Sequence, residues 1–137
     1  MSWLLDTKVL SEIRKGTRGD PGVQRWSSGR DDNAYISVLT LGELRRGVEL
    51  KRRRDPTTAG HLDAWLNVLT TAFASRILPV DQRVADQWGR LGLPDRIPAI
   101  DGLLAATALV HRLTLVTRNV VDFAKTGVPV LDPFDAP

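Results

Sequence analysis

Short apolar segments alternate along this chain with longer segments in which apolar residues recur at helical spacing. This alternation constrains the fold more than any other feature of the sequence. The short segments are rich in β-branched residues and are predicted as strands, at residues 2–5, 34–38, 76–80, 113–117 and 128–131. Strands joined through helices pair in parallel, and right-handed crossovers place the helices on both faces. The sequence therefore predicts an α/β fold with a central, mainly parallel sheet of four to five strands.

The segments between the strands carry helix start and stop signals. A helix is expected from Thr40 and another from about Asp101, which opens a run of small apolar residues and predicts a buried helix. A break at Asp55 separates the first of these from a long helix that continues to Phe73. The tail, residues 132–137, is expected to be loose.

The bulk properties limit the class of protein. With 137 residues the chain is expected to form a single domain, 1–137. It has no cysteine, which excludes disulfides and thiolate metal sites. The N-terminus lacks a basic leader segment, and no apolar run approaches the roughly 18 residues of a membrane span. A soluble, cytoplasmic protein is expected.

Four acidic residues lie at or near strand-to-helix junctions. Asp6 ends the first predicted strand, and Glu43 lies in the first turn after the second. Asp101 opens the small-residue helix, and Asp122 follows the fourth strand by a few residues. Each acid can be explained singly as a helix cap, worth about 0.3–1 kcal/mol, and the Thr40–Glu43 pair matches a capping box.

The four acids together favour a different interpretation. In a parallel sheet the carboxyl ends of the strands meet at one edge, where ligands bind. Carboxylates gathered there repel one another unless a cation lies among them, and oxygen ligands select Mg²⁺ or Mn²⁺. His61 and His111 lie far apart and are interpreted as surface or packing residues.

Hydroxyl and amide side chains accompany the acids. Thr7 follows Asp6, and Thr117 and Asn119 precede Asp122. They are candidates either for local capping and turn hydrogen bonds or for orienting the carboxylates around a metal.

A basic stretch follows Glu43 immediately. Residues 45–54 carry six bases and one acid, in a chain of net charge +3. The stretch is either a solvated helix face or a surface that binds phosphate polymers. Its candidate substrate-binding residues are Arg45, Arg46, Lys51 and Arg52. An acidic metal site beside a basic surface is the combination expected of a metal-dependent nuclease.

Four segments resemble a known family. "LLDTKVLSE", "ISVLTLGELRRGVE", "IPAIDGLLAATAL" and "LVTRNVVDF", in this order, resemble the PIN-domain ribonucleases, in particular the VapC and FitB toxins of bacterial type II toxin–antitoxin pairs. The resemblance implies a three-layer α/β/α domain and Mg²⁺- or Mn²⁺-dependent cleavage of RNA. It places Asp6, Glu43, Asp101 and Asp122 on the acidic quartet of the family, as catalytic and metal-binding residues. Thr7, Thr117 and Asn119 fall on its supporting positions.

The resemblance also implies partners. These toxins form homodimers and toxin–antitoxin assemblies, each is neutralised by a cognate antitoxin, and the pair binds operator DNA through the antitoxin. Trp26, Trp65 and Trp88 are compatible with a dimer seam or with core packing.

One residue departs from the family pattern. Where the family usually has asparagine after "LDT", this chain has Lys8. A lysine there can pair with the acids and compete with a metal, hold a substrate phosphate, or point outward. Two other functions stay open: a catalytically silent or weakly active module that binds an antitoxin or nucleic acid, and an RNA-maturation or DNA-directed nuclease.

Overall fold

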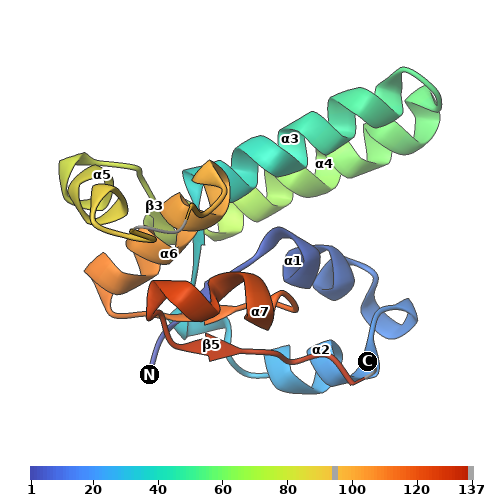
Figure 1. Ribbon diagram of the computed structural model, residues 1–137. Helices are drawn as coiled ribbons and strands as arrows, with labels where there is room; N and C mark the ends of the chain where they lie inside the picture. Colours follow the sequence, from blue (N-terminus) through green and yellow to red (C-terminus); the bar gives the residue numbers. More distant parts are fainter. Residues whose placement is uncertain (94–95, 136–137) are drawn as a thin grey trace.

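The computed structural model describes residues 1–93 and 96–135, and it has one five-stranded parallel sheet within them. The strand order is β3-β2-β1-β4-β5, and every pairing is parallel (Figure 1). The strands are β1 (Trp3–Leu5), β2 (Ala34–Ser37), β3 (Ile77–Leu78), β4 (Thr114–Val116) and β5 (Val130–Leu131). The predicted α/β class is confirmed, and each strand lies inside its predicted segment but is shorter.

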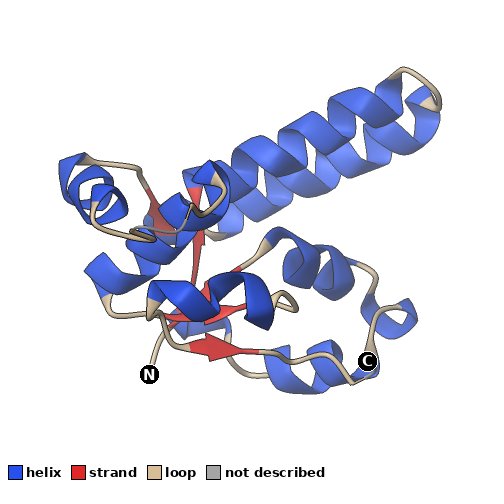
Figure 2. Cartoon of the chain, viewed as in Figure 1, coloured by secondary structure: helices blue, strands red, loops and turns tan. Residues whose placement is uncertain are grey.

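Helices follow each of the first four strands (Figure 2). They are α1 (Thr7–Arg14), α2 (Pro21–Ser27), α3 (Val38–Arg52), α4 (Pro56–Ala72), α5 (Gln82–Gly89), α6 (Ala99–His111) and α7 (Val120–Phe123). Single 3₁₀ turns occupy Gly16–Arg18, Asp31–Asn33, Ala74–Arg76 and Ala124–Thr126. Among the described residues, no helix combines the length and the hydropathy that crossing a bilayer requires.

Side chains alternate between two cores, one on each face of the sheet. On β1, Trp3 and Leu5 belong to a core built with α1 to α4, whereas Leu4 belongs to a core built with α6 and the segment around Phe123. This is the period-2 alternation of a strand covered on both faces. The predicted three-layer α/β/α architecture is confirmed.

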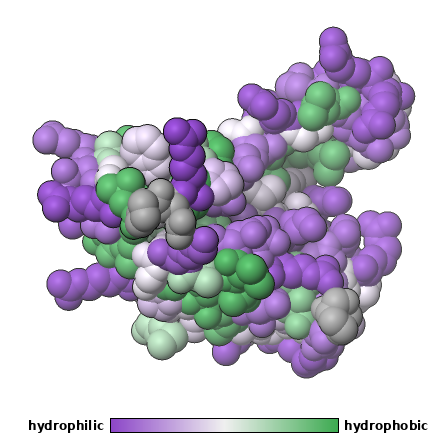
Figure 3. All heavy atoms as spheres, in the orientation of Figure 1, coloured by the Kyte–Doolittle hydropathy of each residue, from purple (hydrophilic) through white to green (hydrophobic). Residues whose placement is uncertain are grey.

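The helices α3 and α4 form an antiparallel hairpin that projects from the rest of the molecule (Figure 1). Leu44 and Val48 of α3 and Leu66 and Leu69 of α4 are buried at its base. Farther out the two helices are joined by ion pairs, and the end of the hairpin is covered mainly by hydrophilic residues (Figure 3). The hairpin therefore presents the basic stretch on an exposed arm.

Two predicted helix starts are wrong by two residues. Helix α3 begins at Val38 because the Ser37 hydroxyl accepts a hydrogen bond from the backbone N–H of Leu39, at 3.0 Å. Thr40 therefore lies inside the helix, and the predicted capping box with Glu43 does not form. Helix α6 likewise starts before Asp101, at Ala99, so Asp101 is a first-turn residue rather than the N-cap.

The predicted cap at Asp6 is confirmed, because its side chain accepts from the N–H of Thr7. Asp55 and Asp81 cap α4 and α5 in the same way. Asp122 lies in the first turn of α7. Capping and a functional role are compatible for Asp6, because its carboxylate has two oxygens.

Two of the three tryptophans considered for a dimer seam belong to the core. Trp26 contacts Trp3 edge-on, with ring centroids 5.2 Å apart, and Trp65 packs on the same core. Trp88 on α5 is 44% exposed. Core packing thus explains Trp26 and Trp65, and Trp88 remains a candidate for an interface.

The expectation of a loose tail is wrong for residues 132–135. The Asp135 N–H donates to the Asp20 carboxylate at 3.1 Å, and Arg25 of α2 pairs with the Asp135 carboxylate. Pro133 is buried, and the half-buried Phe134 packs against the core. The close approach is possible because Gly22 of α2 has no side chain. Residues 136–137 lie outside the described residues.

Replacing Gly22 with alanine is expected to destabilise the fold. A Cβ there would lie 2.7 Å from the backbone nitrogen of Asp135, so the tail must shift, and overpacking of this kind costs about 1–3 kcal/mol. Gly60→Ala is the matched control, because Gly60 lies in α4 with open space around its Cα. Alanine there is expected to stabilise the helix by about 0.5–1 kcal/mol. Urea unfolding of both variants checks the prediction, which equal effects would contradict.

Candidate active site

The carboxyl ends of β1 and β4 form the topological switch point of the sheet. From β1 the chain runs outward to β2 and β3, then returns to β4 on the other side of β1. Helices leave neighbouring strands in opposite directions at such a point and open a crevice between them, which is where ligands bind in open α/β sheets. Asp6 follows β1 and Thr117 follows β4, so both lie at this crevice. The Asp6 N–H donates to the Val116 carbonyl at 3.0 Å and joins the two strand ends.

The Asp6 carboxylate is held by two donors. One oxygen accepts from the backbone N–H of Thr7 and the other from the Thr117 hydroxyl, each at 2.7 Å. Thr117 is fully buried, and its hydroxyl oxygen also accepts from the N–H of Asn119 at 3.1 Å. Donors from both strand ends therefore fix the carboxylate in one orientation.

Glu43 is tied to this site from α3. The Thr7 hydroxyl donates to Glu43 at 2.9 Å, so one threonine contacts both acids: Asp6 through its backbone and Glu43 through its side chain. The two residues of the Thr7–Glu43 bond are 36 positions apart in sequence. This contact brings the exposed carboxylate of Glu43 to the crevice.

The surroundings of Asp101 clearly shift its pKa. Burial raises its pKa above the ordinary range, and the charges of Asp122, Asp6 and Glu43 raise it further. The other three predicted acids are thus each within electrostatic reach of Asp101. Their individual roles remain predictions.

The acids form an open group rather than a closed cage. Across residues 1–93 and 96–135, no three histidine or acidic side chains converge closely enough to form a ready-made metal site. Mg²⁺ does not require one, because it usually retains several waters and binds through one or two carboxylates. The oxygen-only donors and the mutual repulsion that raises the pKa of Asp101 both fit a divalent cation.

Residues 3–128 match the PIN domain family. The chain belongs to the PIN-domain family. It is 34% identical over 136 residues to the toxin FitB of Neisseria gonorrhoeae, covering 96% of this chain and 97% of FitB. It is 29% identical over 138 residues to a VapC ribonuclease of Sinorhizobium fredii, covering 96% and 97%.

Solved structures agree with this assignment. FitAB bound to a DNA fragment matches with a TM-score of 0.87 and 31% identity, covering 98% of this chain and 97% of that chain. FitAcB from Neisseria gonorrhoeae matches with a TM-score of 0.86 and 34% identity, covering 96% and 97%. The resemblance to PIN-domain proteins of the VapC and FitB type is confirmed.

Lys8 of this PIN domain is directed to a neighbouring pocket rather than to the acids. It is exposed on α1 and lines a cavity with Lys15 and Arg118. Among the described residues it makes no ion pair with Glu43 or Asp101. The alternative that Lys8 pairs with the acids and competes with a metal is therefore not supported by any contact between them.

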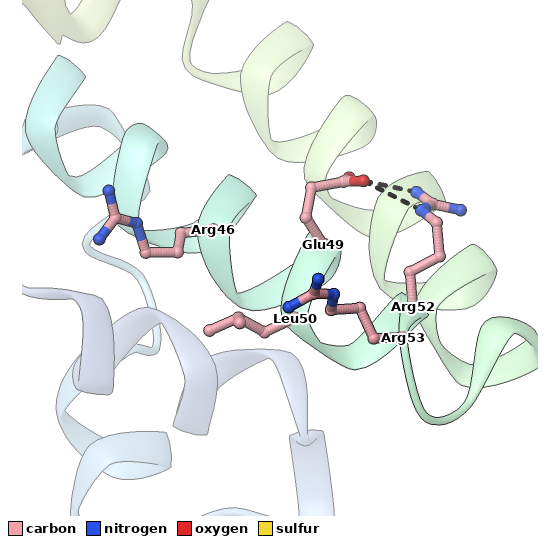
Figure 4. A pocket seen from close by; sticks show the side chains of 5 residues that line it. All are labelled: Arg46, Glu49, Leu50, Arg52 and Arg53. Carbon is pink, nitrogen blue, oxygen red and sulfur yellow. Dashed lines mark hydrogen bonds and ion pairs between the residues drawn. The ribbon is translucent and has the colours of Figure 1, made fainter.

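The basic stretch of this PIN domain divides between two faces of α3. Arg45 and Arg52 pair with Glu49 on the same helix and with Asp63 on α4, and the closest N–O distance in each pair is 3.0–3.1 Å. In Figure 4 the dashed lines join Glu49 to Arg52. Lys51 is half-buried. These pairs hold the hairpin together and draw Arg45 and Arg52 away from other partners.

Arg46 makes no ion pair with a described residue and lines a groove together with Glu43. The groove has a volume of about 540 Å³, and the rest of its lining consists of apolar residues and glycines. Arg53 was not predicted as a binding residue, although it lines the adjoining pocket with Arg46, Leu50 and the Glu49–Arg52 pair (Figure 4). The sequence contained the information needed to include Arg53, because Leu50 and Arg53 lie four and seven residues after Arg46 and therefore share one face of the helix.

Proposed function

We propose that this chain is the toxin of a type II toxin–antitoxin pair and acts as an endoribonuclease that requires Mg²⁺ or Mn²⁺. The observation that carries the proposal is the gathering of acids at the switch point, where Thr7 contacts both Asp6 and Glu43 and where the charges of Asp122, Asp6 and Glu43 add to burial in raising the pKa of Asp101. Relatives named as toxins and ribonucleases that share nearly the whole chain support it.

Asp6 and Asp101 would hold the principal ion, and Glu43 and Asp122 would complete the negative charge around it. When bound, a divalent cation neutralises charge on a phosphoryl oxygen and makes water more acidic. The chain itself contributes orientation, because Thr117 and Thr7 fix Asp6, and Thr7 also holds Glu43. The negative charges of the four acids repel a substrate phosphate from the crevice until a bound cation balances them.

The α3 groove would guide the substrate. Arg46 lines both the groove beside Glu43 and the next pocket along the helix, where Arg53 joins it. A phosphate backbone held by these guanidinium groups passes directly to the acids. Water attack on the phosphorus with loss of the 3′ oxygen gives a 5′ phosphate and a 3′ hydroxyl.

The proposed partners are a cognate antitoxin and a second copy of the chain. Solved structures similar to this one carry both components: FitAB is bound to a DNA fragment, and another is a toxin–antitoxin complex from Klebsiella pneumoniae. Operator DNA would be bound through the antitoxin. The exposed Trp88 is a candidate contact of a homodimer, and light scattering measures the mass in solution.

Cleavage of single-stranded RNA tests the proposal. We expect cleavage with Mg²⁺ or Mn²⁺, none with EDTA, and recovery on adding the metal back, with end-labelling to confirm the 5′ phosphate. Single-stranded DNA of the same sequence is the parallel substrate. Cleavage of DNA alone favours a DNA-directed nuclease, and cleavage in EDTA contradicts the metal site.

Mg²⁺ is expected to raise the melting temperature more at pH 7.5 than at pH 5. Binding to the folded state stabilises it by mass action, and Asp101 must be ionised to contribute. Burial and neighbouring acids raise the pKa of Asp101, so Asp101 becomes protonated at a pH above the range in which an ordinary aspartate does. Its protonation removes one negative charge from the metal site and weakens Mg²⁺ binding. Without metal the sign is opposite: the contribution of Asp101 to stability is present at low pH and lost as pH rises through the raised pKa.

Differential scanning fluorimetry with and without about 1 mM Mg²⁺, a thousand times a micromolar Kd, measures this shift. NaCl of equal ionic strength is the control for screening. A catalytically silent module whose acids only cap helices would show no shift that depends on Mg²⁺ at either pH.

A further inference from the structure

A second pocket is lined by the residues that directly follow Thr7 and Thr117. It has a volume of about 490 Å³ and lies between α1, the residue after Thr117 and the C-terminal tail. Its lining includes Lys8, Glu12, Lys15, Asp20, Arg118 and Phe134. None of these residues belongs to the proposed metal site.

The backbone connects this pocket to the metal site in two places. Lys8 directly follows Thr7, which donates to Glu43, and Arg118 directly follows Thr117, which donates to Asp6. Glu43 itself lines the α3 groove. The contacts that hold Asp6 and Glu43 are therefore next in sequence to residues of the second pocket, and one of these acids lines the groove.

The acid on α1 in this pocket is already engaged. Glu12 pairs with Lys15 at 2.6 Å and accepts from the Asp20 N–H at 3.1 Å. The hydrogen bond from Lys15 is the main reason that the pKa of Glu12 lies below its ordinary range. Glu12 and Lys15 thus balance each other.

Asp20 is engaged as well. One of its oxygens accepts from the N–H groups of Val23 and Asp135, each at 3.1 Å. Burial acts to raise its pKa, but these N–H donors and the charge of Arg118 outweigh burial and lower it. Lys8, by contrast, makes no ion pair with any described residue. The pocket therefore offers an ammonium group to an added anion.

An aromatic platform forms the opposite part of the pocket. The guanidinium of Arg118 lies 5.0 Å from the ring centroid of the half-buried Phe134. Planar guanidinium groups and aromatic rings are the surfaces on which unpaired RNA bases stack. A positive group and a stacking surface in one pocket match a nucleotide rather than a free anion.

We propose that this pocket binds one nucleotide of a single-stranded RNA, adjacent to the scissile phosphate. Lys8 holds the phosphate of that nucleotide, and its base stacks on the Arg118–Phe134 pair. This inference rests on the proposed ribonuclease function, and it makes the pocket a site that influences which sequence is cut.

Binding without cleavage tests the pocket. In an Asp101→Asn background, which prevents cutting, short single-stranded RNAs carrying one 2-aminopurine at successive positions report both affinity and stacking. Lys8→Gln is expected to weaken binding and to lower the slope of log K against log salt by about 0.7, the value for one phosphate contact on a single strand. Arg118→Lys keeps the charge and the slope, but weakens binding by about fivefold or more and restores fluorescence at one position.

Arg83→Gln is the matched control, because Arg83 is exposed on α5 and lines neither pocket. It removes one positive charge and is expected to change neither the slope nor the fluorescence. Equal effects of Lys8→Gln and Arg83→Gln, no quenching at any position, or no RNA binding would overturn the inference. Cleavage by the wild-type protein is measured in parallel, and its absence contradicts the ribonuclease proposal independently of the binding result.

Discussion

Asp101→Asn is expected to reduce RNA cleavage by more than about 100-fold and, in the absence of metal, to stabilise the fold. Loss of an outer partner of a metal ligand already costs 10–100-fold, so loss of a ligand should cost more. The stabilisation has a separate cause: burial and three like charges oppose ionisation of Asp101, and asparagine removes the charge. The measurements are a single-turnover cleavage rate and a melting temperature in EDTA.

The control is Asp86→Asn on α5. Asp86 is exposed, and its ion-pair partner among the described residues is Arg90 on the same helical surface, at 3.0 Å. An exposed pair of this kind contributes about 0–1 kcal/mol, so neither cleavage nor stability should change appreciably. Undiminished cleavage by Asp101→Asn would remove the acidic site as the source of activity.

Asp6→Asn should show the same loss of cleavage with the opposite effect on stability. Its carboxylate accepts bonds from Thr7 and Thr117, one on each oxygen. Asparagine replaces one of these acceptors with a donor, which costs roughly 1–3 kcal/mol. The two substitutions thus have opposite effects on stability, because hydrogen-bond donors stabilise the charge of Asp6 whereas burial and other acids oppose the charge of Asp101.

The strands were predictable because β-branched residues gather in short runs, but the order of the strands was not. Nothing in the local pattern around residues 114–116 says that β4 pairs with β1 rather than with β3. Periodicity predicted only an α/β fold with a parallel sheet, and the resemblance to PIN domains specified the three-layer α/β/α domain. The predicted helix starts at Thr40 and Asp101 were two residues late, because the helices begin directly after Ser37 and Pro98.

The candidate acids were predictable from their junctions, whereas their contacts were not. The Thr7–Glu43 bond joins residues 36 positions apart, and the Thr117–Asp6 bond joins residues 111 apart. The tail was predicted as loose because its composition is turn-like, and its docking depends on a missing side chain at Gly22. The Lys8 pocket needs that docked tail, so no local pattern could indicate it.

Thr117→Val is expected to lower metal affinity and cleavage by about 10–100-fold, the range found when a partner of a metal ligand is lost. Valine keeps the shape of this fully buried residue but removes the hydroxyl. The Asp6 carboxylate then loses the donor at 2.7 Å that fixes it from β4, and the Asn119 N–H loses its acceptor. Titration with Mg²⁺, followed by melting temperature, measures the affinity apart from the rate.

Thr117→Ser separates positioning from packing. Serine keeps the hydroxyl and removes a buried methyl group, which costs about 0.8 kcal/mol of stability. We therefore expect Thr117→Ser to be less stable than the wild type with near-normal metal affinity, and Thr117→Val to have weakened metal affinity that higher Mg²⁺ partly restores. Normal metal affinity in Thr117→Val would mean that Asp6 is oriented without Thr117. Asp6 would then be held by the Thr7 N–H alone, a backbone donor that only a proline at this position removes.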